Sequence, residues 1–136
     1  MIEQAIMNYL KSNIQTDMLI SMNFTTRNDN TIVVYSDPGE PPSMYEGQLI
    51  RPRYQIIVKS SDFAKANDIS LQIYELLHQH RYDTMTVSYK TREIDYNVFS
   101  IDGLHLPARL GVDEDNIMSY SLNFETQIKK ASERKK

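Results

Sequence analysis

Three histidines are the side chains best suited to act as a base or a metal ligand, because the chain contains no cysteine. The lack of cysteine excludes disulfides, thiolate nucleophiles and cysteine-ligated zinc or iron–sulfur sites. His78 and His80 lie two residues apart in a segment with helical periodicity, which places them about 200° apart around the helix axis. His105 is distant from both in the sequence. The spacing does not predict a metal site, and we interpret His78 and His80 as polar residues at a helix C-terminus.

The acidic run from Asp113 to Asp115 is the other feature that could bind a cation. It lacks the alternating carboxylates and the glycine of a calcium-binding loop, so we interpret it as a solvated turn. The four glycines are too scattered for a phosphate-binding loop, and there is no Gly-x-Ser-x-Gly motif. The sequence therefore predicts no catalytic, metal or cofactor site, and we expect a non-enzymatic protein that binds other proteins.

Charge is distributed unevenly along the 136 residues, which carry a net charge of −3. Residues 129–136 hold five basic residues against one acidic residue, a net charge of +4, whereas residues 1–128 carry −7. An acidic body is not typical of a nucleic-acid-binding protein. We expect residues 1–128 to form a single α+β domain and residues 129–136 to form a basic, disordered tail.

No apolar run approaches the roughly 20 residues that are needed to span a bilayer. Residues 1–10 contain an acidic residue and no basic residue, so they do not resemble a signal peptide. We expect a soluble protein with no membrane partner.

Hydrophobic periodicity predicts two helices and several strands. Apolar residues recur every three or four positions in residues 2–14 and again in residues 63–80, where Ser60 to Asp62 can cap the second helix. Alternating or β-branched segments predict strands over residues 18–24, 31–36, 50–59, 84–89, 95–106 and 117–128. The first of these segments could instead continue the first helix. We predict an α+β fold in which both helices pack on one face of a largely antiparallel sheet of about four to five strands.

The strand at residues 117–128 has the clearest alternation of the chain. Its core face is predicted to hold Met118, Tyr120, Leu122, Phe124 and Ile128. The opposite face is predicted to be solvated and to hold Ser119, Ser121, Asn123, Glu125 and Gln127.

One long loop, residues 37–49, contains three of the five prolines and two of the four glycines. Because neither residue type favours a continued strand, and because such long loops are often functional, we predict an assembly interface here that becomes ordered when a partner binds. Met44 and Tyr45 are side chains that could enter a neighbour's pocket. The candidate interface residues are Asp37, Pro38, Gly39, Glu40, Pro41, Pro42, Ser43, Met44, Tyr45, Glu46 and Gly47.

A second candidate interface follows the loop at Arg51, Pro52 and Arg53. Proline cannot donate to a strand ladder, so it is typical of sheet edges and bulges. We therefore predict that the strand at residues 50–59 begins at a sheet edge or a bulge.

Two segments carry a family resemblance. They are IRPRYQIIVKSSDFAKANDISLQIYELL, residues 50–77, and NIMSYSLNFETQIKK, residues 116–130. Together with the short first helix and the long loop at residues 37–49, these segments make the chain resemble the tail terminator, or tail-to-head joining, proteins of long-tailed bacteriophages, often labelled minor capsid proteins.

The resemblance implies a virion assembly protein, made in the host cytoplasm and located at the head-proximal end of the tail. It implies a protomer of a six-fold ring, which can be monomeric when free. Such a ring caps the tail tube, stops its growth and contacts the tube protein and a head completion protein, while DNA passes through without specific binding.

Two alternatives remain open from the sequence. A head–tail connector or neck protein of similar size belongs to the same structural class, and the end of the tail that the protein decorates distinguishes the two. A ligand-binding or regulatory α+β module belongs to another class and requires a concave apolar pocket.

Overall fold

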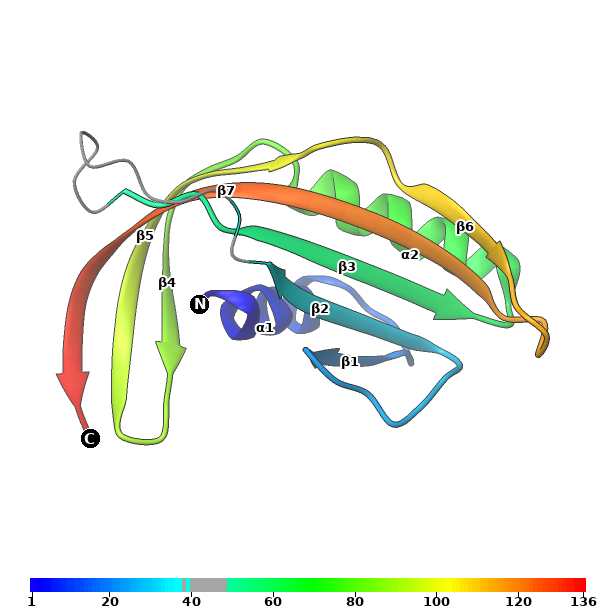
Figure 1. Ribbon diagram of the computed structural model, residues 1–136, viewed down its shortest axis with the longest axis horizontal. Coiled ribbons are helices and arrows are strands. Elements are labelled where there is room, and N and C mark those ends of the chain that lie inside the picture. Colours follow the sequence, from blue (N-terminus) through cyan, green and yellow to red (C-terminus); the bar gives the residue numbers. More distant parts are fainter. Residues whose placement is uncertain (38, 40–48) are drawn as a thin grey trace.

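The computed structural model describes residues 1–37, 39 and 49–136 of the chain. Within them the elements are α1 (Glu3–Asn13), β1 (Leu19–Met22), β2 (Thr31–Asp37), β3 (Arg53–Ser60), α2 (Phe63–Leu77), β4 (His80–Ser88), β5 (Arg92–Gly103), β6 (Ala108–Val112) and β7 (Met118–Lys135) (Figure 1). The predicted α+β class is confirmed, but the described sheet has seven strands and not four to five.

The strands follow the order β1-β2-β3-β7-β5-β4, and β6 also pairs with β7. The β1–β2 pair is parallel and the other pairs are antiparallel. The long strand β7 lies between β3 and β6 along its first part and then pairs with β5. Together β4, β5 and the last third of β7 form an arm that curves away from β3 (Figure 1).

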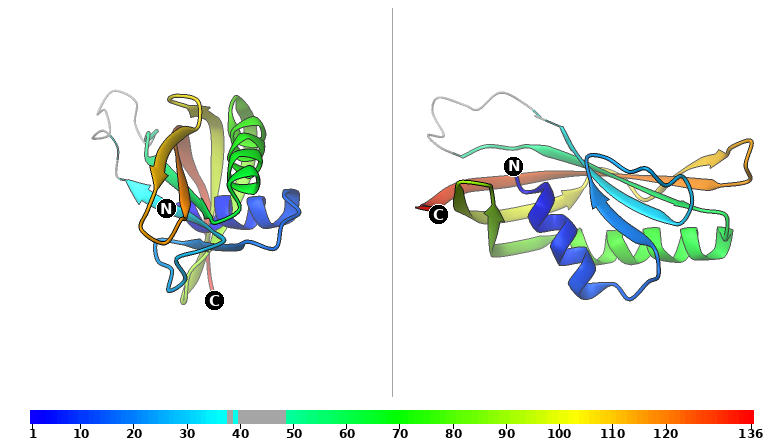
Figure 2. Two further views of the ribbon diagram at one scale, coloured as in Figure 1. Left: turned by 90° about the vertical axis from the view of Figure 1, so that its right-hand side faces the viewer. Right: turned by 90° about the horizontal axis from the view of Figure 1, so that it is seen from below.

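Both helices cover one face of the sheet and bury its alternate side chains (Figure 2). Ile6 and Leu10 of α1 and Ile73 of α2 join Ile56 and Leu122 of the sheet in one hydrophobic cluster. Burial of one aliphatic side chain of this kind stabilises the folded state by about 1.5–3 kcal/mol. Neither of the described helices is long and apolar enough to cross a membrane.

The helix α2 begins as its sequence predicts. Asp62 is the N-cap residue, and its Oδ1 accepts a hydrogen bond from the Lys65 amide at 3.1 Å. The helix ends at Leu77, three residues before the predicted end, because Gln79 adopts a left-handed conformation with φ of 60° and His80 already begins β4.

The basic C-terminal segment is a strand, so the expectation of a disordered tail does not hold. Residues 129–135 continue β7 and pair with β5, from Asn97 with Lys129 to Arg92 with Lys135. Arg134 of this segment donates to Asp95 and Glu93 of β5. The basic segment is thus paired with acidic residues roughly 40 positions earlier in the chain. The charge pattern of residues 129–136 alone does not predict this pairing.

Contrary to the prediction of an edge or a bulge, Pro52 places β3 neither at a sheet edge nor at a bulge. The strand β3 lies between β2 and β7, and Pro52, directly before it, is buried. The Pro52 carbonyl accepts hydrogen bonds from the Thr126 amide at 3.0 Å and the Thr126 hydroxyl at 2.8 Å. Proline cannot return a bond to β7, so it delays the start of β3 to Arg53 without exposing the strand.

Candidate assembly surface

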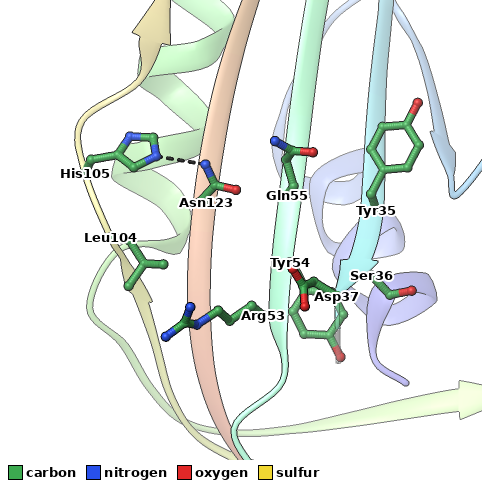
Figure 3. A pocket seen from close by; sticks show the side chains of 9 residues that line it. All are labelled: Tyr35, Ser36, Asp37, Arg53, Tyr54, Gln55, Leu104, His105 and Asn123. Carbon is green, nitrogen blue, oxygen red and sulfur yellow. Dashed lines mark hydrogen bonds between the residues drawn. The ribbon is translucent and has the colours of Figure 1, made fainter. Parts of the chain in front are cut away.

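The face of the sheet that the helices leave uncovered holds rows of polar side chains (Figure 3). Gln55 of β3 is the cross-strand partner of Tyr35 in β2 and of Asn123 in β7. Two residues earlier in β3, Arg53 is the cross-strand partner of Asp37 in β2 and of Glu125 in β7. Because strand side chains alternate, all six lie opposite the buried face of the sheet.

These rows line two adjacent hollows that are open to solvent. The larger, of about 580 Å³, is formed by Tyr35, Ser36, Asp37, Arg53, Tyr54, Gln55, Leu104, His105 and Asn123. The second, of about 500 Å³, shares Tyr35 and Gln55 and extends along the sheet to Leu110 and Val112 of β6. Their linings mix polar and apolar groups, as protein contact surfaces do.

Both ring nitrogens of His105 take part in hydrogen bonds. The Asn123 amide lies 2.8 Å from Nε2, and Nδ1 lies 2.6 Å from the Leu106 carbonyl (Figure 3). Because a carbonyl can only accept, Nδ1 carries the proton and Nε2 accepts from Asn123. Neither nitrogen is left to serve as a general base for a serine of the hollow.

Tyr54 contributes little acid–base capacity to the larger hollow. Its hydroxyl oxygen accepts a hydrogen bond from the Ile2 amide at 3.0 Å, on the helix side of the sheet. Burial raises the pKa of the Tyr54 phenol far above its ordinary value of 10.0, so the group stays protonated at neutral pH.

The structure brings together only part of the two predicted interfaces. Asp37 and Arg53 are cross-strand partners, and the Arg53 guanidinium lies 3.8 Å from the Glu125 carboxylate. The Gly39 amide donates to Asp37 Oδ1 at 3.0 Å. Arg51 and Pro52 precede β3, while Pro38 and residues 40–47 lie outside the described residues. That these residues contact partners stays a prediction.

The remaining histidines and the acidic run have structural partners. His78 Nδ1 accepts from the Gly103 amide at 3.0 Å, and His80 Nε2 lies 2.8 Å from Asp83 Oδ2. Asp113 Oδ1 accepts from the amides of Asp115 and Ile117 and so shapes the β6–β7 turn. In the part of the chain that the structure describes, no group of three or more His, Asp or Glu side chains could hold a metal ion.

Sequence reasoning missed an exposed apolar stripe along β6 and the segment before it. We call it the β6 stripe: Leu104, Leu106, Leu110 and Val112, with exposed fractions of 47%, 68%, 61% and 46%. The two-residue spacing within each pair, on either side of Pro107, was the available signal. Such spacing is typical of a strand, but whether the strand's apolar face is covered depends on its neighbours.

The sequence model described as bacteriophage tail terminator protein matches residues 9–130. The chain belongs to the bacteriophage tail terminator family. Among curated proteins, none is significantly similar to this chain in sequence. The predicted resemblance is confirmed, and the tail terminator is a structural protein of the phage tail and a component of the virion.

Proposed function

We propose that this tail terminator caps the head-proximal end of the tail tube as a six-fold ring, stops tube growth and joins the tail to the head. The observation that carries the proposal is the family match, which spans residues 9–130 and therefore includes the open sheet face and the β6 stripe. Its partners are further copies of itself, the tube protein and a head completion protein. It is made in the host cytoplasm before it enters the virion.

Two features of the molecule support a role in assembly. A ring protomer needs two different contact surfaces, since each copy meets one neighbour on either side. Four large apolar side chains lie exposed on the edge strand β6 and the segment before it, where they favour aggregation of an isolated protein but become buried in an assembly. The net charge of −7 on residues 1–128 also suits a channel that passes DNA without gripping its phosphates.

The decisive experiment removes the gene and measures tail length by electron microscopy. We expect tubes of uncontrolled length, or tails without heads, and we expect purified protein added during tail assembly to restore both properties. Tails of normal length attached to heads in the absence of the protein would contradict the proposal.

The same preparations distinguish a tail terminator function from a connector function. A label on the protein should mark one end of isolated, headless tails. Label found on tailless heads and missing from headless tails would favour the connector alternative.

A further inference from the structure

The β6 stripe lies on an open edge of the sheet. Among the described strands, β6 pairs with β7 alone, so its other side has no strand partner. Four of the eleven exposed large hydrophobic side chains found in the described residues fall within the nine positions from Leu104 to Val112. This concentration indicates a surface that another protein covers.

The opposite end of the molecule is basic. The tip of the arm consists of the β4–β5 turn and the end of β7, which are joined by a hydrogen bond of 3.0 Å from the Lys136 amide to the Thr91 carbonyl. Lys90 and Lys135 have no acidic partner among the described residues, and Lys136 Nζ contacts only the Ser88 hydroxyl. We call Tyr89, Lys90, Lys135 and Lys136 the arm tip.

Tyr89 gives the arm tip an apolar contact group. Its side chain is 38% exposed, and the Arg92 guanidinium carbon lies 5.6 Å from its ring centroid. Tyrosine next to arginine is a combination that is common at the centre of protein interfaces.

The acidic end of the β6 stripe complements the arm tip. The β6–β7 turn carries Glu114 and Asp115, which are exposed and make no ion pair among the described residues. This turn and the arm tip lie at opposite ends of β7 and of the long axis of the molecule (Figure 1). An 18-residue strand measures about 55 Å along its path, so the two surfaces cannot meet within one copy.

We propose that the arm tip of one copy docks on the β6 stripe of the next copy. Tyr89 packs against the exposed leucines, and Lys135 and Lys136 lie beside Glu114 and Asp115. Two different surfaces then meet at each contact, so the association is head-to-tail and can close into a ring. This inference rests on the proposed ring and names the surfaces that build it.

Two double variants test the pairing. The Lys135→Glu, Lys136→Glu variant places an acidic arm tip against an acidic turn, and the Glu114→Lys, Asp115→Lys variant places a basic tip against a basic turn. We expect each alone to cap tails at least tenfold less well than wild type. An equal mixture should recover capping, because alternating copies restore every attraction in a ring with an even number of members.

Matched controls keep the test specific. Asp68→Lys with Glu75→Lys changes charge by the same amount on the exposed side of α2 and should cap tails as wild type does. Thermal unfolding should be unchanged in all of these variants, because the substituted residues are exposed. Leu110→Ser should weaken capping without any change of charge.

A carbodiimide cross-link provides an independent readout. In assembled protein we expect bonds between Lys135 or Lys136 and Glu114 or Asp115, and in free monomer we expect none. If wild type caps tails but the mixture of variants does not recover, or if these cross-links are missing from the assembly, the pairing is wrong while the proposed function stands. Failure of wild type itself to cap tails would contradict the proposed function and the inference with it.

Discussion

Ser121 shows how a neighbouring strand changes the environment of a single residue. It lies on the sheet face opposite the helices, where the alternation of β7 predicts solvent, yet it is only 5% exposed. Its cross-strand neighbours are Ile57 of β3 and Ala108 of β6, and its hydroxyl accepts a hydrogen bond from Gln55 Nε2 at 3.2 Å. The prediction of a solvated Ser121 is wrong because β6, a strand that the sequence analysis does not predict, pairs with this part of β7.

Ser121→Asp should therefore destabilise the isolated protein. A carboxylate here is buried without a basic partner, and we expect the free energy of unfolding to fall by more than about 2 kcal/mol. Ser119→Asp is the matched control: Ser119 lies on the same face but is half-buried and opposite Lys59, so its cost should stay within about 1 kcal/mol. Chemical denaturation measures both, and equal losses would mean that β6 does not cover Ser121.

At the scale of elements, a polar network stabilises the arm. Asp95 of β5 accepts hydrogen bonds from the Thr86 hydroxyl of β4 at 2.6 Å and the Ser132 hydroxyl of β7 at 2.7 Å. The Arg134 guanidinium also donates a hydrogen bond to this carboxylate. These contacts, led by Arg134, hold the pKa of the Asp95 carboxyl well below its ordinary value of 3.8.

The arm should consequently loosen in acid. A carboxyl whose pKa is lowered by folding stabilises the protein fully above its unfolded pKa, and this contribution is lost as the pH falls through the lower, folded pKa. We expect amide exchange of residues 129–135 to accelerate as the pH drops below 3.8, after correction for the intrinsic exchange rate. Asp95→Asn should show fast exchange at neutral pH and a much weaker acid dependence. An unchanged pH profile in this variant would show that Asp95 does not hold the arm together.

At the scale of the whole molecule, the predicted loop interface is a hypothesis independent of the docking of the arm tip on the β6 stripe. The double variant Met44→Ser, Tyr45→Ser should keep the free energy of unfolding within about 0.5 kcal/mol of the wild-type value. It should, however, abolish incorporation of the protein into tails. Leu71→Ser, at an exposed apolar position on α2, is the control and should be incorporated normally. If the double variant is incorporated as well as the control, the loop is not an interface.

The sequence by itself determined both helices and the faces that the two longest-patterned strands, β3 and β7, turn to the core. The helices α1 and α2 and the buried faces of β3 and β7 follow from side-chain spacing, because three-to-four periodicity and alternation are properties of a short stretch of chain. The Asp62 cap is equally local.

Only the tertiary structure decided which strands are neighbours. It placed β3 in the middle of the sheet in spite of Pro52, and it left β6 at an edge with Leu110 and Val112 exposed. It also turned residues 129–135 into a strand, because Asp95 and Glu93 supply the opposite charges. Each of these outcomes depends on contacts between residues far apart in the sequence, and burial, edge position and charge pairing exist only once those residues meet.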